Sequence, residues 1–386
     1  MFESFRTKIV AAIMSFFMAI GSLFGFSAAP EENGGREIKN VIYLIGDGMG
    51  FNHLQKTKKE RNVSLVMESF PIKGSSRTRS LSSSVTDSAA GGTALSTGVR
   101  TGNSMVGVYY TDKDIHISYP KNITELCKER GMLTGVITTD ATSGATPASF
   151  SAHSSDRDNT QDITDDQLSS GIDIIWGKAN GLVTESIAEE NGFVYVQNYN
   201  DMMALEEGSR SFAQFDDSLW KLDPVKDSPN LQQMAERAVD LLDDTEEGFF
   251  LMIEGAHIDK HSHNEDSANM TIALQEFDRT VEAMLSYAEA DGQTLVVVTA
   301  DHETGAITPD GDSYVYTSSS HSSADVPVFL YGSEDIISDG ETLKNCEIPV
   351  RIAGVLGFKE TEFPVSVYKQ KLISKTASEL MRSVFL

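Results

Sequence analysis

The chain has 386 residues, with 31 Lys and Arg against 57 Asp and Glu, so its formal charge is 31 − 57 = −26. Charged residues make up 23% and hydrophobic residues 40%, an ordinary globular composition that argues against disordered, collagen-like and disulfide-scaffold proteins. The acidic excess would repel a phosphate backbone, which disfavours duplex nucleic-acid binding as a main role.

The N-terminus has the pattern of a targeting segment. Arg6 and Lys8 precede an uncharged apolar run over residues 9–26, and small residues follow up to Ala29. This order is typical of a secretory signal, so we expect residues 1–29 to be removed and the mature chain to be soluble and exported, either periplasmic or secreted. The apolar run of 18 residues is also near the lower limit for a membrane-spanning helix, so an uncleaved anchor is the alternative. The cleaved bond stays open because a proline follows Ala29 directly.

From residue 40 onward, short apolar runs rich in β-branched residues alternate with longer helical patterns. Expected strands are Val41–Ile45, Leu133–Ile137, Phe249–Ile253, Leu295–Thr299 and Val326–Leu330, and expected helices are 121–130, 229–243 and 267–290. Continuous apolar strands alternating with helices predict an α/β fold, a three-layer αβα sandwich around a mostly parallel sheet. We expect one catalytic domain over residues 37–386. Within it, the polar and acidic segment 155–228 shows only weak strand signals and is expected to be a loop-rich insertion over the sheet.

Three of the apolar runs end in an acidic residue, namely Asp47, Glu254 and Asp301. In open α/β sheets, ligands bind at the carboxyl ends of the strands. A single carboxylate there is usually a helix cap, but three of them, each beside further ligand-type residues, favour a binding site.

Imidazoles accompany these acids. Asp259 and His263 are spaced i, i+4, so one helical turn would direct both side chains to one cation. His302 follows Asp301, and His321 lies in a Ser-rich loop before the last expected strand. Carboxylate and imidazole ligands suit zinc, whereas oxygen ligands alone suit magnesium. We expect the remaining histidines to have other roles. His53, His116 and His153 should be structural or exposed, and His257 and His261 should either be structural or support the ligands.

The two cysteines are far apart and in no CxxC pattern, so a thiolate metal site is excluded. Cys127 and Cys346 could form one disulfide or remain two buried thiols. Both alternatives stay open.

Ser88 is a candidate nucleophile. It follows Asp87, a plausible helix N-cap, and begins a run of small residues. The free N–H groups and the dipole at a helix N-terminus favour an anionic ligand, and metal coordination can activate a serine hydroxyl. No GxSxG motif surrounds Ser88, so a Ser-His-Asp esterase is poorly supported. Arg157 could hold two phosphoryl oxygens with its planar fork.

Taken together, these motifs resemble those of the alkaline phosphatase family. They occur in order between about residues 40 and 331 and cover most of the expected mature chain. The motifs are Gly46-Asp-Gly-Met-Gly50, Thr86-Asp-Ser-Ala-Ala90, Ser96-Thr-Gly-Val99, Glu254-Gly-Ala-His-Ile-Asp259, Thr299-Ala-Asp-His302 and His321 ahead of Asp325-Val-Pro-Val328. The resemblance implies phosphomonoester hydrolysis through a phosphoserine intermediate, at a site with two zinc ions and one magnesium ion, in a protein that is commonly a homodimer.

The resemblance also implies a role for each matching residue. The first zinc would be held by Asp259, His263 and His321; the second by Asp47, Asp301 and His302, with Ser88 as nucleophile; and magnesium by Asp47, Thr146 and Glu254. Arg157 matches the phosphate-binding arginine, and Lys260 resembles a lysine that some members place near phosphate through water.

One position departs from the family pattern. Relatives carry an acidic residue or a histidine two positions before the magnesium-ligand Thr or Ser, where this chain has Gly144. The nearby Asp140-Ala-Thr142 imitates that motif but lacks its proline and its spacing to Arg157. Magnesium is therefore the part of the site that the sequence supports least.

Two other functions compete with phosphomonoester hydrolysis. A sulfatase needs an arginine four residues after its nucleophile, and Gly92 stands at that position, but a phosphodiesterase stays open. A non-enzymatic phosphate- or metal-binding protein is disfavoured because Ser88 accompanies the full set of matched zinc ligands.

Overall fold

A mostly parallel sheet lies at the centre of the described chain. The computed structural model describes residues 37–109, 117–243 and 245–364, so the expected signal at 1–29, His116 and the tail from residue 365 lie outside the described residues. Ten strands form the sheet in the order β14-β2-β13-β8-β1-β7-β3-β4-β6-β5, and β13 is antiparallel to both its neighbours. Their bounds are β1 (Asn40–Ile45), β2 (Ile72–Arg77), β3 (Leu133–Ala141), β4 (Ile174–Lys178), β5 (Val194–Val196), β6 (Ser211–Phe215), β7 (Phe249–Glu254), β8 (Thr294–Thr299), β13 (Val326–Tyr331) and β14 (Thr342–Lys344).

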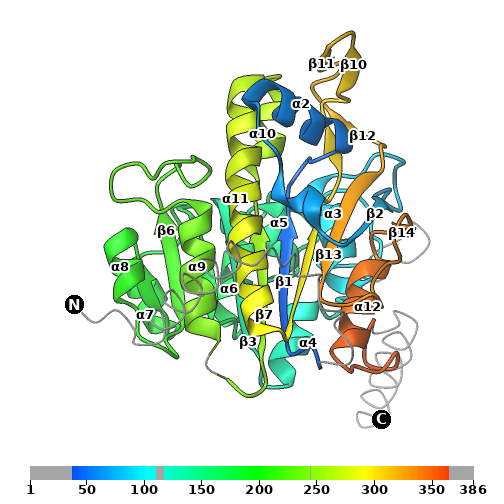
Figure 1. Ribbon diagram of the computed structural model, residues 1–386. Helices are drawn as coiled ribbons and strands as arrows, with labels where there is room; N and C mark the ends of the chain where they lie inside the picture. The colour runs from blue at the N-terminus through cyan, green and yellow to red at the C-terminus, as the bar shows by residue number, and fades with distance from the viewer. Residues whose placement is uncertain (1–36, 110–116, 244, 365–386) are drawn as a thin grey trace, which may run out of the picture. The chain divides into compact units, whose positions relative to one another are not determined.

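Helices cover both faces of this sheet (Figure 1). Side chains alternate between the two faces of a strand, so a strand buried on both faces is apolar throughout. In β1, Ile42 and Leu44 pack in one hydrophobic cluster with the helices at residues 231–242 and 267–291, while Val41 and Tyr43 pack in the other with those at residues 123–129 and 347–355. The three-layer α/β fold expected from the sequence is confirmed.

The helices vary from one turn to seven. Their bounds are α2 (Phe51–Arg61), η1 (Val66–Ser69, a 3₁₀ helix), α3 (Ser88–Thr97), α4 (Ile123–Glu129), α5 (Ala145–Ser149), α6 (Thr160–Ser169), α7 (Glu185–Glu190), α8 (Tyr199–Ala204), α9 (Leu231–Leu242), α10 (His257–His263), α11 (Ser267–Asp291) and α12 (Glu347–Val355). Two short ribbons complete the described chain, one of β9 (Glu303–Thr304) with β12 (His321–Ser322) and one of β10 (Thr308–Asp310) with β11 (Ser313–Val315). Among the described residues, no helix is long and apolar enough to cross a membrane.

The segment 155–228 differs from its expectation as a loop-rich insertion. It contains α6, α7 and α8, and it supplies β4, β6 and β5, which extend the sheet on one side. These strands have few consecutive apolar residues because they lie toward an edge, where neighbouring strands and helices decide their pairing.

Both cysteines are free thiols: Cys127 is buried and Cys346 is half-buried.

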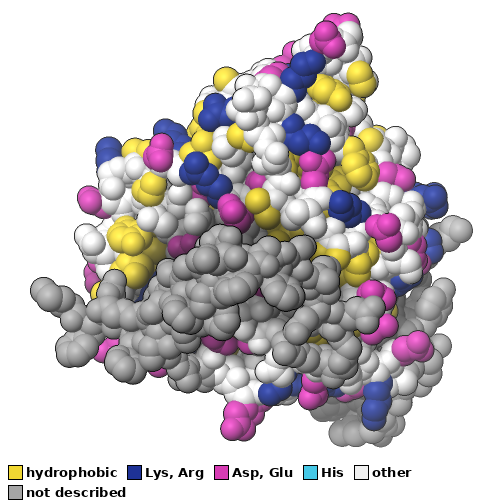
Figure 2. Space-filling model, viewed as in Figure 1, with side chains coloured by type: hydrophobic (Ala, Val, Ile, Leu, Met, Phe, Trp, Pro, Cys, Tyr) yellow, Lys and Arg dark blue, Asp and Glu magenta, His cyan; other side chains and the backbone are white. Residues whose placement is uncertain are grey.

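The described part of one face of the molecule carries charged side chains of both signs. On the face shown in Figure 2, acidic and basic side chains are interspersed, with small hydrophobic patches between them. The net charge therefore does not make this face a single acidic surface.

Candidate active site

Three carboxylates gather where the central parallel strands end. Asp47 follows β1, Glu254 ends β7 and Asp301 follows β8, and the strand register places Ile45 of β1 beside Glu254. All three are buried, with at most 7% of each residue exposed. Burial raises the pKa of each carboxyl group, and repulsion from the other acids raises that of Asp47 further; the pKa of Glu254 rises to about 8. Such acids stay ionised together only where cations offset their charge.

Asp259, His263 and His321 form the first group of donor atoms. Nδ1 of His263 lies 2.7 Å from the carbonyl oxygen of Ser319, and Nδ1 of His321 lies 3.0 Å from that of Thr86. A carbonyl oxygen only accepts, so these partners assign the proton of each neutral ring to Nδ1 and leave a lone pair on Nε2. The two Nε2 atoms are 3.1 Å apart, and they lie 3.3 and 3.6 Å from Oδ1 of Asp259. Three electron-pair donors this close fit a cation between them, and the donor set suits zinc.

Asp47, Asp301 and His302 form the second group. Nε2 of His302 lies 3.3 Å from Oδ2 of Asp301 and 3.5 Å from Oδ1 of Asp47. These two carboxylate oxygens are buried and have no hydrogen-bond partner among the described residues. Burial, and then the neighbouring His321, lower the pKa of His302 to about 3, which keeps the ring neutral. Ligand atoms of this group, and those of the set Asp259, His302 and His321, each lie within 4.8 Å of one another, as expected for a metal site.

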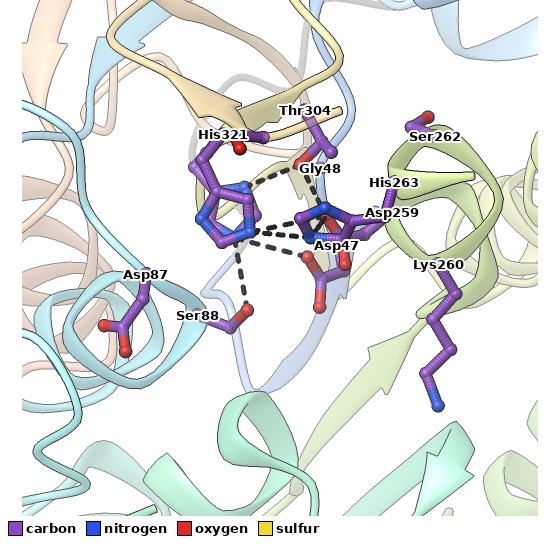
Figure 3. Close-up of polar contacts among 12 residues, drawn as sticks. Asp47, Gly48, Asp87, Ser88, Asp259, Lys260, Ser262, His263, Thr304 and His321 are labelled. Carbon is purple, nitrogen blue, oxygen red and sulfur yellow. Dashed lines mark hydrogen bonds and ion pairs between the residues drawn. The ribbon is translucent and has the colours of Figure 1, made fainter. Parts of the chain in front are cut away.

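Ser88 points into this second group from the first turn of α3 (Figure 3). Its Oγ lies 3.1 Å from Nε2 of His302, and the residue is 4% exposed. Asp87 is the N-cap, as expected, and its Oδ1 accepts a hydrogen bond from the Ala90 N–H at 3.0 Å. Small residues let α3 lie close to the segment that carries Asp301, because a Cβ atom at Gly91 would lie 2.9 Å from the carbonyl oxygen of Asp301.

Arg157 lies beside the same helix N-terminus. Its NH1 is 3.3 Å from Oδ2 of Asp87, and about a third of its side chain is exposed. The Ser104 N–H also donates to this carboxylate oxygen, at 2.8 Å. Asp87 therefore caps α3 with one oxygen and orients the guanidinium with the other.

Glu254 has further polar groups near it, from Thr138, Asp140 and Lys260. The Thr138 hydroxyl donates to Glu254. Thr146, on α5, is 1% exposed, and its hydroxyl oxygen has no hydrogen-bond partner within the described part of the chain. The Lys260 ammonium pairs with Asp140, so its side chain extends away from the two donor groups (Figure 3). Burial alone would lower the pKa of Lys260, but the Asp140 carboxylate raises it above its ordinary value. Oδ2 of Asp140 lies 2.9 Å from where a Cβ of Gly144 would be, so it occupies the space that the glycine leaves open.

Most of the residues singled out in the sequence thus lie at one edge of the sheet, and only Lys260 is directed elsewhere. The sequence did not single out Thr304, whose hydroxyl contacts both Asp259 and His302. It also gave no role to Asp140 as the partner of Lys260. Two features of the sequence could have indicated these residues. Thr304 is two residues after the candidate ligand His302, and Asp140 begins an Asp-Ala-Thr sequence that resembles the family's magnesium motif.

A sequence model of the protein family described as alkaline phosphatase matches residues 38–178 and 172–353 of this chain. Alkaline phosphatase 3 of Bacillus subtilis is 34% identical over 329 residues, which cover 79% of this chain and 70% of that protein. Alkaline phosphatase 4 of the same organism is 28% identical over 424 residues, covering 100% of this chain and 88% of that protein.

Solved structures give the same assignment. The alkaline phosphatase from the Antarctic bacterium TAB5 aligns with a TM-score of 0.71 and 28% sequence identity, over 84% of this chain and 99% of that one. The residues matched by the family model include the three acids at the strand ends and the three histidines of the donor groups. The chain belongs to the alkaline phosphatase family, and it is a metal-dependent hydrolase that acts on phosphoric monoesters.

Proposed function

We propose that this protein hydrolyses phosphate monoesters through a phosphoserine intermediate on Ser88 and releases inorganic phosphate and an alcohol. The observation that carries the proposal is the position of the Ser88 hydroxyl. It lies at the N-terminus of α3, 3.1 Å from Nε2 of His302, beside two groups of donor atoms that can bind metal ions. Each of the other residues has a place in the same reaction.

In the first displacement, Oγ of Ser88 loses its proton and attacks phosphorus in line with the ester oxygen. The bond from phosphorus to that oxygen breaks, and the alcohol leaves with a proton. In the second displacement, a water molecule attacks the phosphoserine, Oγ of Ser88 leaves and recovers a proton, and inorganic phosphate is released. The Ser88 hydroxyl is directed into the second group of donor atoms, where its Oγ lies 3.1 Å from Nε2 of His302.

Two further groups bind the phosphoryl oxygens. The Arg157 guanidinium, oriented by Asp87, donates two parallel N–H bonds to a phosphoryl group. The first N–H groups of α3 have no partner within the helix, and they donate to the oxygens that carry charge during the displacement.

We infer that the site holds two zinc ions and one magnesium ion. Asp259, His263 and His321 would hold the first zinc; Asp47, Asp301 and His302 the second; and Asp47, Thr146 and Glu254 the magnesium. Bound cations supply Lewis-acid chemistry, because they lower the pKa of coordinated hydroxyl groups and offset negative charge on phosphate. A mutant of the TAB5 enzyme is described with Mg bound in its M3 site, which supports the third position.

These cations also account for an anionic substrate in a chain of charge −26. Exposed charges act over a Debye length of about 8 Å at physiological salt. Three divalent ions held by these residues would therefore outweigh the dispersed surface acids at the distance where the phosphate binds.

The cellular setting and assembly belong to the same proposal. We infer that residues 1–29 direct export to the periplasm or the medium, and that the mature protein is a homodimer. N-terminal sequencing of the exported protein tests the first inference, and sedimentation equilibrium tests the second. An unprocessed N-terminus or a monomer at micromolar concentration would contradict them.

The central test compares the wild type with Ser88→Ala. The control is Ser84→Ala, at an exposed serine four residues earlier. Hydrolysis of p-nitrophenyl phosphate should fall roughly 10³-fold or more in Ser88→Ala and stay unchanged in the control. Acid quenching with a ³²P-labelled ester should trap phosphoserine in the wild type and in the Ser84→Ala control, but not in Ser88→Ala.

Two results would reject the proposal. One is unchanged turnover in Ser88→Ala with full metal content. The other is faster cleavage of bis(p-nitrophenyl) phosphate than of the monoester, which would instead indicate a phosphodiesterase.

A further inference from the structure

Thr304 occupies a central position among the donor groups, although it is not a candidate ligand itself. It lies on β9, directly opposite His321 in the ribbon with β12, and it is fully buried. Its N–H donates to the carbonyl oxygen of Gly48, in the loop that follows Asp47, at 3.0 Å. Its backbone therefore joins the segment that carries His321 to the loop that carries Asp47.

The Thr304 side chain contacts one residue of each donor group (Figure 3). Oγ1 lies 2.5 Å from Oδ1 of Asp259, in the first group, and 3.2 Å from Nδ1 of His302, in the second. The hydroxyl has one hydrogen and two lone pairs, so it can donate to only one of these neighbours.

The chemistry of the neighbours decides which one. An ionised carboxylate accepts and cannot donate, so the close pair of oxygens requires the Thr304 hydroxyl to donate to Asp259. Its lone pair then accepts from His302, which places a proton on Nδ1 of that ring. With Nδ1 protonated, Nε2 of the neutral ring is bare, and it faces Ser88, Asp47 and Asp301.

The arrangement depends on a glycine at position 48. Its φ of +74° lies in the left-handed region. A Cβ atom there would come within 2.8 Å of Cβ of Asp259 and 2.9 Å of Oγ1 of Thr304. The close approach of Thr304 and Asp259 therefore needs a residue without a side chain beside them.

We propose that Thr304 is a positioning residue. Its hydroxyl accepts from Nδ1 of His302, which holds that ring with Nε2 free for a metal ion, and it donates to Asp259, so it links the two donor groups. The inference rests on the proposed function, because it assigns to those groups the zinc ions named above. Partners that orient a metal-bound histidine typically contribute 10- to 100-fold to metal affinity.

The test uses two variants: Thr304→Val, which is isosteric but removes the hydroxyl, and Thr304→Ser, which keeps the hydroxyl and removes the methyl group. The control is Thr308→Val, at an exposed threonine four residues later. Zinc stoichiometry and affinity are measured by competition with a chromophoric chelator, without substrate. We expect Thr304→Val to bind the second zinc roughly 10- to 100-fold more weakly and Thr304→Ser to stay within about threefold of the wild type.

Nuclear magnetic resonance gives a second measurement on the zinc-loaded protein. Histidine ring N–H protons that donate to a buried partner exchange slowly with water, and the number of slow ones should fall by one in Thr304→Val alone. Activity on p-nitrophenyl phosphate should fall in Thr304→Val and recover as zinc is added, which a packing defect would not produce.

Two outcomes would overturn the inference: wild-type zinc affinity in Thr304→Val, or an equal loss in Thr304→Ser, which would assign the effect to the methyl group. Because zinc binding is measured without substrate, a wild type that binds zinc but fails to hydrolyse phosphate monoesters would reject the proposed function and leave this inference standing.

Discussion

Glu276 provides a pH-dependent test of the packing of α9 against α11. Its side chain is fully buried on α11, and its Oε1 accepts the N–H of Gln232, in the first turn of α9, at 3.1 Å. Its Oε2 has no hydrogen-bond partner among the described residues. Burial raises the pKa of Glu276 from an ordinary 4.5 to about 8, so the folded protein prefers the neutral carboxylic acid.

The sign of the effect follows from proton binding. The folded state holds the Glu276 proton up to about pH 8, whereas the unfolded chain releases it above 4.5. The contribution of Glu276 to the free energy of unfolding is therefore fully present below pH 4.5 and is lost as the pH rises through 8. At about 1.4 kcal/mol per pH unit, the full loss is about 5 kcal/mol, and about 3 kcal/mol of it falls between pH 6 and pH 9.

The substitution Glu276→Gln keeps the shape of the side chain and the acceptor for the Gln232 N–H, but the amide cannot ionise. The control is Glu289→Gln, at an exposed position on the same helix. The free energy of unfolding in urea is measured at pH 6 and pH 9. The wild type should lose about 3 kcal/mol of unfolding free energy from pH 6 to pH 9, whereas Glu276→Gln should not, so the variant gains about 3 kcal/mol relative to the wild type. The buried amide N–H₂ of the variant costs about 1–3 kcal/mol at both pH values. A difference from the wild type that does not change with pH would show that Glu276 does not titrate with a raised pKa in the folded protein.

Three further predictions concern the active site. Asp87→Asn keeps a good helix cap but loses the charge that orients Arg157, so the inhibition constant for inorganic phosphate should rise about 3- to 10-fold, and an unchanged constant would contradict this role. Asp140→Asn releases Lys260 toward the phosphate, so the same constant should fall, and no change would show that their ion pair does not restrain the lysine. Chelation of the metal ions should lower the melting temperature more at pH 9 than at pH 6. The reason is that the carboxyl group of Glu254, whose pKa is about 8 without cations, loses its proton over that range and then repels the neighbouring acids. An equal decrease at both pH values would argue against repulsion among the acids.

The centre of the fold could be predicted from the sequence because its strands are buried on both faces. β1, β7 and β8 are continuous apolar runs in the printed sequence, and each one is a central strand. β2, with the sequence IKGSSR, has no such run, since it lies near an edge and is partly exposed. Its pairing with β13 depends on residues about 250 positions away, which no local pattern contains.

The candidate site could be predicted in its residue types but not in its connections. Asp259 and His263 are one helical turn apart, so their shared direction follows from helix geometry alone. The contact of Thr304 with Asp259 depends on a glycine in another segment, and the pairing of Lys260 with Asp140 depends on the absence of a side chain at residue 144. Both connections are set by close approach in space, which motif spacing does not report.

The buried acids and the bound cations depend on each other. Strand register, not mutual attraction, brings Asp47, Glu254 and Asp301 to one edge, since the apolar strands pair whether or not the acids are neutralised. Without cations, burial makes every one of these carboxyl groups more difficult to ionise, and the lone pairs of His263 and His321 face each other across 3.1 Å. Metal binding therefore relieves an unfavourable arrangement that the sheet imposes, so its free energy contributes both to the activity and to the stability of the sheet edge.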